Sequence, residues 1–309
     1  MRLSIVGTLY HSQEYIYEFY HRCRSVAEKH AGDDWELVFV NDGSPDSSLE
    51  KAVEIANKDD HVVVIDLSRN FGHHKAMMTG LMYAAGEHVF LIDTDLEEEP
   101  EWLNAFADLM KDRSCDVVYG VQSRRKGGLF ERISGSVFYA LFRKASGLDF
   151  PANIVTARLM TQRYVQALIL HTEREIFLAG IWHITGFLQV GTCVNKGYKG
   201  NSTYTFPKKL QIAIDSITSF SVKPLIMMFH LGVFISGIAL IYIAFIVAQR
   251  LFFTQPQSGW TSVVASVWLF GGLIISFQGI LGLYIAKVFS EAKQRPYTVI
   301  REIYRKRHG

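Results

Sequence analysis

Two long stretches in the last third of the chain contain no Asp, Glu, Lys or Arg: Leu225–Ala248 and Val263–Ala286. Each is about 24 residues long, and a helix needs roughly 20 apolar residues to cross the hydrocarbon core of a bilayer. The alternative is a pair of buried helices in a soluble core, but charge-free runs of this length are rare there. The sequence therefore predicts a transmembrane hairpin at 225–287, with one span in each stretch.

Basic residues flank these stretches unevenly. Lys208, Lys209 and Lys223 precede the first, a basic segment follows the second, and the connection between them holds only Arg250. By the positive-inside rule, both termini are expected in the cytoplasm. Because Met1-Arg2 runs straight into a strand-like segment, no signal peptide is expected. The predicted location is the inner (plasma) membrane, multi-pass, and the predicted parts are a cytoplasmic domain 1–205, an amphipathic juxtamembrane linker 206–224, the hairpin 225–287 and a basic cytoplasmic tail 288–309.

Short apolar segments alternate with helix-like segments through the first part of the chain. This alternation predicts an α/β domain with a mainly parallel sheet. Ligands in such sheets bind at the carboxyl ends of the strands. The expected strands are Leu3–Thr8, Trp35–Asn41, Val62–Leu67, His88–Asp93 and Asp116–Val121, and the expected helices are Glu14–His30, Ser47–Lys58, His73–Ala85 and Glu101–Lys111.

Two carboxylates, Asp93 and Asp95, stand at the end of the fourth expected strand. Alternation along a strand would turn both to the same side. Two such carboxylates repel each other unless a cation lies between them, and Mg²⁺ or Mn²⁺ is commonly held by carboxylates together with substrate phosphates. A metal–diphosphate site is one interpretation, and a solvated turn is the other.

Polar clusters also follow the second and third expected strands. In Asn41-Asp42-Gly43-Ser44, Asp42 is placed to accept a hydrogen bond from a base or ribose, although a simple strand–turn–helix junction explains the cluster equally well. In Ser68-Arg69-Asn70-Phe71-Gly72, Arg69 is placed to pair with a phosphate, and Gly72 leaves backbone N–H groups accessible at a helix start. A surface salt bridge is the alternative for Arg69. Convergence of three clusters on one sheet edge favours a binding site.

The overall charge is close to neutral, with a formal value of +2. No global basic surface therefore indicates nucleic-acid binding. Cys23, Cys115 and Cys193 are far apart and show no metal-ligand spacing.

These motifs together carry a resemblance. The chain resembles family 2 glycosyltransferases of the GT-A (Rossmann-like) fold, and more narrowly the polyprenyl-phosphate glycosyltransferases, which include the dolichyl-phosphate mannose synthases. The resemblance covers nearly the whole chain, and the order of its motifs makes it specific. The matching segments are Asn41–Ser44, Ser68–Gly72, Asp93–Leu96, Asp116–Gly120, Gly200–Tyr204 and Ile217–Ser221 before the hairpin.

The resemblance implies a nucleotide-sugar donor, with a UDP-sugar as first choice, and a polyprenyl (undecaprenyl-type) phosphate acceptor. It implies Mg²⁺ or Mn²⁺ as cofactor, held with the diphosphate by Asp93 and Asp95, and inversion at the anomeric carbon. Relatives commonly assemble as tetramers, so a homo-oligomer is expected. The residues expected to bind the nucleotide are Thr8, Tyr10, Asp42, Arg69 and Asp93. The segment Gly200–Tyr204 is expected to contribute Ser202 and Tyr204 to the acceptor-phosphate site.

The chain departs from the family pattern at several points. Thr8-Leu9-Tyr10-His11-Ser12 keeps only the tyrosine of a usual Pro-x-Tyr-Asn-Glu turn, and Asn41 and Thr203 stand where aspartate and lysine are common. The family's Asp-Phe-Arg-Leu segment reads Thr156-Ala157-Arg158-Leu159 here, so the aspartate near the acceptor is missing.

The missing aspartate is more tolerable with a phosphate acceptor than with a sugar hydroxyl. A hydroxyl needs a general base, whereas a phosphate monoester with a second pKa of about 6 is already largely dianionic at neutral pH. It needs positive charge, and Arg158 is the first choice for that contact and for a catalytic role beside Asp93 and Asp95. Further candidates form the basic cluster Arg124, Arg125 and Lys126, for which a solvated loop or lipid headgroup contact is the alternative.

Two amphipathic segments, 130–148 and 208–220, suit the membrane surface, where a soluble donor must meet a lipid acceptor. Packing on the chain's own domain is the alternative for the first. Two other functions stay open: transfer to a hydroxyl of a lipid-linked sugar, and a non-catalytic nucleotide-sugar-binding membrane subunit. The pattern identifies neither the sugar, the base nor the length of the polyprenyl chain.

Overall fold

The computed structural model describes residues 2–122, 153–173, 178–197, 223–252 and 259–306. The two amphipathic segments predicted at 130–148 and 208–220 lie outside these residues. The chain divides into two compact units, one formed by residues 1–139, 149–204 and 295–309 and the other by residues 140–148 and 205–294.

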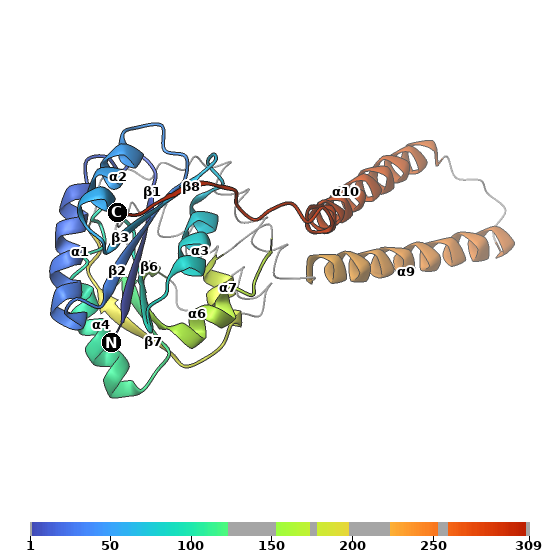
Figure 1. Ribbon diagram of the computed structural model, residues 1–309. Helices are drawn as coiled ribbons and strands as arrows, with labels where there is room; N and C mark the ends of the chain where they lie inside the picture. The colour runs from blue at the N-terminus through green and yellow to red at the C-terminus, as the bar shows by residue number, and fades with distance from the viewer. Residues whose placement is uncertain (1, 123–152, 174–177, 198–222, 253–258, 307–309) are drawn as a thin grey trace. The chain divides into compact units, whose positions relative to one another are not determined.

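The first unit is built on an eight-stranded sheet with strand order β7-β5-β6-β4-β1-β2-β3-β8 (Figure 1). Strands β1 to β4 are parallel to one another, as β5 and β7 are to each other, whereas β6 is antiparallel to β4 and β5, and β8 to β3. The strands are β1 Leu3–Leu9, β2 Trp35–Asn41, β3 Val62–Leu67, β4 His88–Leu91, β5 Val117–Gln122, β6 Ile154–Thr161, β7 Gln189–Val194 and β8 Ile300–Tyr304.

Helices cover both faces of the sheet, with α1, α2 and α4 on one face and α3, α6 and α7 on the other (Figure 1). The aromatic part of the core lies under the first group, where Phe19 contacts Phe39 and Phe90 contacts Phe106, with ring centroids 5.9 and 6.0 Å apart. The helices are α1 Ile16–Ala31, α2 Ser48–Lys58, α3 His73–Tyr83, α4 Trp102–Arg113, α6 Gln162–Leu168 and α7 Leu178–Ile184.

The α/β prediction is confirmed as a mixed sheet of the GT-A kind. Parallel strands covered on both faces read as continuous apolar runs, and this pattern located β1 to β5 and α1 to α4 to within two residues. The antiparallel β6 and β8, and the strand β7, were not predicted. Strand β8 comes from the stretch expected only as a basic tail.

The second unit contains two long helices, α9 Lys223–Phe252 and α10 Trp260–Ala292. Within the described residues, one helix is long and apolar enough to cross a membrane, at Leu269–Ala292 with a mean hydropathy of 1.9, and Lys223–Ile235 is a shorter apolar helix. The described residues thus provide one candidate span, and the predicted two-span hairpin stays a prediction.

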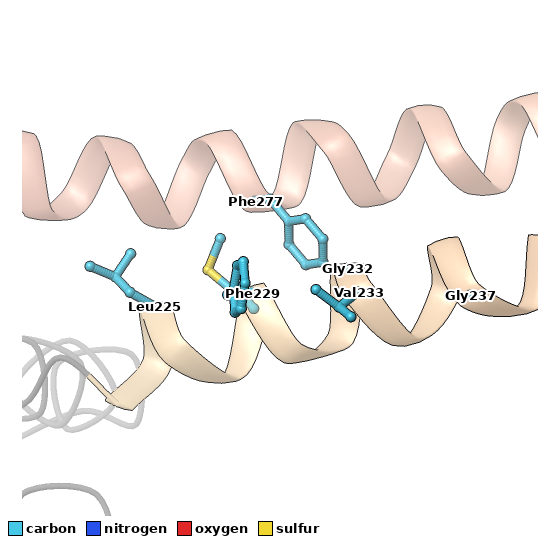
Figure 2. Close-up of a pocket in the computed structure, with 7 residues that line it drawn as sticks. Leu225, Phe229, Gly232, Val233, Gly237 and Phe277 are labelled. Carbon is cyan, nitrogen blue, oxygen red and sulfur yellow. The ribbon is translucent and has the colours of Figure 1, made fainter.

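An apolar groove runs between these two helices (Figure 2). Phe277 of α10 points toward α9 at Gly232 and Val233, and Leu225 and Phe229 line the groove further along. A Cβ added at Gly232 would meet nothing within 4 Å, so the groove is open at this residue.

Candidate active site

The candidate site lies at the carboxyl edge of the parallel strands, where the loops after β1, β2, β3 and β4 meet. The aspartate pair is not held there by strand alternation, as the sequence suggested, because β4 already ends at Leu91. Thr94 between the two aspartates is the anchor. Its hydroxyl donates to the Thr8 carbonyl at 2.7 Å, and its methyl group packs where a Cβ on Gly7 would be only 2.6 Å away.

Asp93 is the centre of this edge. His73, at the start of α3, has its Nε2 atom 3.1 Å from Asp93 Oδ1, and its Nδ1 atom 3.0 Å from Thr8 Oγ1. Burial raises the pKa of Asp93, but His73 and Lys196 outweigh that effect and hold it below its usual value. The His73 side chain is 50% exposed, so it stays within reach of a ligand. Sequence reasoning missed it, although it directly follows Gly72 of a predicted motif.

Lys196, just after β7, carries a positive charge into the same acidic edge. Its ammonium nitrogen is 3.0 Å from Glu98 Oε1 and 3.8 Å from both Asp93 Oδ2 and Glu97 Oε2. Burial lowers the pKa of Lys196, but the carboxylates of Glu98, Asp93 and Asp95 raise it more. The ammonium is therefore charged at neutral pH and offsets part of the negative charge beside Asp93.

Glu98 is fully buried at this point. Its two oxygens accept the backbone N–H groups of Thr156 at 3.0 Å and Ala157 at 2.8 Å. Burial, followed by the charge of Asp93, raises the pKa of Glu98 to about 7. A carboxylate thus binds the backbone at Thr156, where the family aspartate is missing, but it is not exposed to substrate.

Asp42 is also buried, and it holds the next loop in place. Its carboxylate oxygens accept the N–H groups of Phe71 at 2.7 Å and Gly72 at 3.0 Å. Burial raises the pKa of Asp42, and these two N–H groups oppose the shift. Gly43 makes the close approach possible, since its φ is +61° and a Cβ there would lie 2.5 Å from the Asn70 nitrogen. The expected contact of Asp42 with a base or ribose stays a prediction.

Other expected nucleotide-binding residues lie at the same edge. Tyr10 is 49% exposed beyond β1, and Thr8 is buried and bonded to His73. Arg69 lies over the Phe71 ring and donates to the Asn70 carbonyl at 2.9 Å. The structure brings these residues together with Asp42 and Asp93.

Arg158 lies inside the protein. Its side chain is only 1% exposed, it is stacked on the Trp182 ring, and it donates to the carbonyls of Thr156 and Val155 at 3.2 and 3.4 Å. Burial lowers its pKa to about 9, so it remains charged at neutral pH. The predicted contact with an acceptor phosphate and the catalytic role stay predictions, which the enclosure of the guanidinium by protein does not favour. The other acceptor-phosphate candidates, Arg124, Arg125, Lys126, Ser202 and Tyr204, lie outside the described residues.

Residues 4–169 match the family model described as glycosyl transferase family 2. The chain belongs to glycosyl transferase family 2. The matched region runs from β1 to α6, so it includes the aspartate pair, Asp42 and Arg69 but not Lys196. The assignment makes the protein a glycosyltransferase of the GT-A fold.

Similarity to relatives extends over the whole chain. A Mycobacterium tuberculosis protein described as a glycosyltransferase is 48% identical over 304 residues, covering 98% of this chain and 89% of its own length. The Bacillus subtilis glycosyltransferase YkcC is 32% identical, covering 98% and 94%. The SfII prophage-derived bactoprenol glucosyl transferase of Shigella flexneri is 31% identical, covering 99% of both chains. The similarity thus includes the two long helices and β8.

Proposed function

We propose that this glycosyltransferase moves a sugar from a UDP-sugar to a polyprenyl phosphate at the cytoplasmic face of the membrane, with inversion at the anomeric carbon. The observation that carries the acceptor assignment is the end-to-end similarity to a protein named bactoprenol glucosyl transferase, at 31% identity and 99% coverage of both chains. The acidic edge built around Asp93 supports the donor assignment, because carboxylates there can hold the divalent cation that a bound diphosphate needs.

The donor set of this edge fits a hard divalent cation. Asp93 Oδ1 is buried and has no hydrogen-bond partner of good geometry among the described residues, although His73 lies nearby. The described residues contain no group of three or more His, Cys, Asp or Glu side chains arranged around a metal position. We therefore infer that Asp93 and Asp95 would hold Mg²⁺ or Mn²⁺ together with diphosphate oxygens. The ion would stabilise the charge that develops on the leaving diphosphate.

The reaction follows from the chemistry of the two substrates. An oxygen of the acceptor phosphate attacks the anomeric carbon while the bond from that carbon to the diphosphate breaks, and the nucleoside diphosphate leaves with the bonding electrons. A single displacement inverts the configuration. Since the acceptor is already anionic, no side chain has to remove a proton. The burial of Glu98 supports this route, because the carboxylate bonded at Thr156 is not accessible to a hydroxyl acceptor.

Chain connectivity supports the hairpin part of the proposal. The first unit contains residues 1–139 and 149–204 together with residues 295–309, and β8 is hydrogen-bonded to β3 within it. One folded domain cannot lie on both sides of a bilayer. The segment of residues 205–294, which connects the two parts of this domain, must therefore cross the bilayer an even number of times. With α10 as one span, α9 is the described helix left for the other, and its 30 residues extend about 45 Å at 1.5 Å per residue. The basic flanking residues then favour a cytoplasmic domain.

Product analysis with purified protein in detergent tests the proposal. The protein is incubated with a panel of UDP-sugars, undecaprenyl phosphate and Mg²⁺ or Mn²⁺. We expect UDP release and a lipid product whose sugar is lost in mild acid, as a phosphodiester-linked sugar is. An acid-stable product formed only from a lipid-linked sugar would instead identify a hydroxyl acceptor. Failure of every donor to release nucleotide would favour the non-catalytic subunit. The expected homo-oligomer stays a prediction that sizing of the same sample tests.

A further inference from the structure

The segment that follows α10, residues 293–306, is called the tail. It adds more than an edge strand to the sheet. Strand β8 pairs with β3, and its register shifts between Asp66 and Leu67: Leu67 lies opposite Ile300 and Asp66 opposite Glu302. Arg301 is the extra residue at this shift. Bulges of this kind redirect a side chain and occur at sheet edges and next to active sites.

The guanidinium of Arg301 reaches across the end of β3. It donates from Nη1 to Asp66 Oδ2 at 3.1 Å and from Nη2 to the Ser68 carbonyl at 2.7 Å. The backbone adds a third link here, because the Ser68 N–H donates to the Val299 carbonyl at 2.8 Å. The residue immediately before Arg69 is thus fixed by the tail on both its N–H and its carbonyl.

Asp66 connects Arg301 to Asn41, the last residue of β2, where the next loop begins. It is fully buried, and its other oxygen accepts the Asn41 side-chain amide at 2.8 Å. Asn41 in turn accepts the Ser44 N–H at 3.3 Å. Arg301 therefore contacts the residue before Arg69 directly, and through Asp66 it holds the residue before Asp42. Both of those residues are expected to bind the nucleotide.

Charge explains why an arginine stands at this position. A buried carboxylate without a charged partner is unfavourable, and Arg301 is the cation that pairs with Asp66. Its own side chain is 57% exposed, so Arg301 contributes less to overall stability than a buried pair would. The bidentate reach of a guanidinium allows one side chain to hold a carboxylate and a carbonyl together.

The start of the tail is tied to α3 as well. Thr298 and Thr79 share a hydroxyl hydrogen bond at 2.9 Å, and the Lys75 ammonium lies 5.8 Å from the Tyr297 ring centroid. Helix α3 begins at His73, directly after the loop that Asp42 holds. Loop Ser68–Gly72 is thus enclosed by Asp42 on one side and the tail on the other.

We propose that Arg301 is a positioning residue for donor binding, which sets the loops after β2 and β3 in the geometry that receives the nucleotide. This inference rests on the proposed function, since it names a determinant of the donor site of that reaction. It also assigns a role to the segment after the last helix: the chain that leaves α10 at Ala292 returns to the catalytic domain and completes its donor site.

Kinetics of the full-length protein in detergent test this role. Arg301→Ala is expected to raise the KM for the UDP-sugar about tenfold, the size of one net hydrogen bond to a charged group, and to leave the KM for polyprenyl phosphate unchanged. Arg301→Lys keeps the charge and is expected to recover part of the loss. Lys306→Ala is the matched control, because it removes a basic residue of the same tail that pairs with the exposed Asp60 at 3.2 Å. UDP affinity, measured by calorimetry, is expected to fall as the donor KM rises.

The experiment distinguishes failure of the proposed function from failure of the positioning role of Arg301. If the wild-type protein neither binds UDP nor transfers sugar, the proposed function itself fails. If wild type is active and Arg301→Ala matches Lys306→Ala in UDP affinity and donor KM, the positioning role is excluded. Equal rises in both substrates' KM, or a lower active fraction with both KM values unchanged and a lower melting temperature, would also overturn it, since they indicate only a structural contact.

Discussion

The carboxyl edge of the sheet has two halves that are built in different ways. In the first half, the loops after β1, β2 and β3 carry Thr8, Asp42 and Arg69, and the Asp42 carboxylate holds the N–H groups of the loop after β3. In the second half, Glu98, Lys196 and Arg158 come from segments far apart in the chain and bury charge against charge or against carbonyl groups. Asp93 joins the halves through His73 and Lys196. We therefore expect the first half to bind the ligand and the second to support Asp93 from the other side.

The strongest test of this division is Asp93, where the halves meet. Changing Asp93 to Asn removes one charge from the proposed metal–diphosphate site, and transfer is expected to fall at least about a hundredfold, as losses of metal ligation do. Chelation of divalent ions in the wild type is expected to have the same effect. Initial rates of UDP release measure both.

Asp60→Asn is the control, because this exposed residue pairs only with Lys306 among the contacts described. Full activity in excess chelator, or in the Asp93 variant, would contradict the proposed site and remove the functional difference between the two halves.

Two glycines of the first half provide the next test. Gly43 and Gly72 both have positive φ, at +61° and +102°, but only at Gly43 would a Cβ collide with backbone, 2.5 Å from the Asn70 nitrogen and 2.6 Å from the Arg69 carbonyl carbon. Gly43→Ala must displace the loop, so the KM for the donor is expected to rise about tenfold or more. The loss of about one hydrogen bond to the nucleotide changes the binding affinity by that factor. Gly72→Ala, with nothing within 4 Å, carries only backbone strain of about 1–3 kcal/mol.

Donor KM and urea unfolding, measured on both variants, separate the two effects. Equal donor KM values in the two alanine variants would show that the close approach of Gly43 to the loop has no role in binding.

The difference between the two halves also explains which elements and site residues could be predicted from the sequence. Strands β1 to β5 and helices α1 to α4 were predicted because each is a local apolar pattern followed by a local turn. Asp42 and Asp93 were found for the same reason. Lys196 and Glu98 are 98 residues apart in the sequence, and no short motif predicts their contact. Strand β8 pairs with β3 across most of the chain and carries Arg301 and Glu302 in its middle, so its pattern resembles a solvated tail. The strand that carries Arg158 was not predicted, and the burial of this arginine depends on Trp182 in a helix distant in sequence.

Lys196 tests the second half by stability rather than by transfer. Changing Lys196 to Met leaves the buried Glu98 without its charged partner, and a loss of about 2–3 kcal/mol in unfolding free energy is expected at pH 8, below the cost of breaking a fully buried pair because the Lys196 side chain is 21% exposed. The loss should shrink toward pH 5. Burial raises the folded-state pKa of Glu98 from its ordinary 4.5 to about 7, so stability is lost as pH rises between these two values. Removing the cation raises this pKa further and extends the loss to higher pH.

Urea unfolding without metal, at both pH values, measures this effect. The double variant Lys196→Met with Glu98→Gln has no unpaired charge and is expected to recover part of the loss, whereas Lys306→Met should change little, as an exposed pair does. A pH-independent loss would show that Lys196 acts by packing alone.

Arg158 gives the smallest expected effect and separates the sequence interpretation from the structural one. If it bound the acceptor phosphate, Arg158→Met would raise the KM for polyprenyl phosphate. Its enclosure by Trp182 and by the carbonyls of Thr156 and Val155 predicts instead an unchanged acceptor KM and a stability loss of about 1–2 kcal/mol, from two backbone acceptors left unpaired. Arg2→Met, which removes an exposed arginine that pairs with the exposed Asp34, is the control for stability and is expected to change it little. A raised acceptor KM in the Arg158 variant alone would mean that this arginine emerges when the lipid binds. The second half of the edge would then take part in the chemistry rather than only support it.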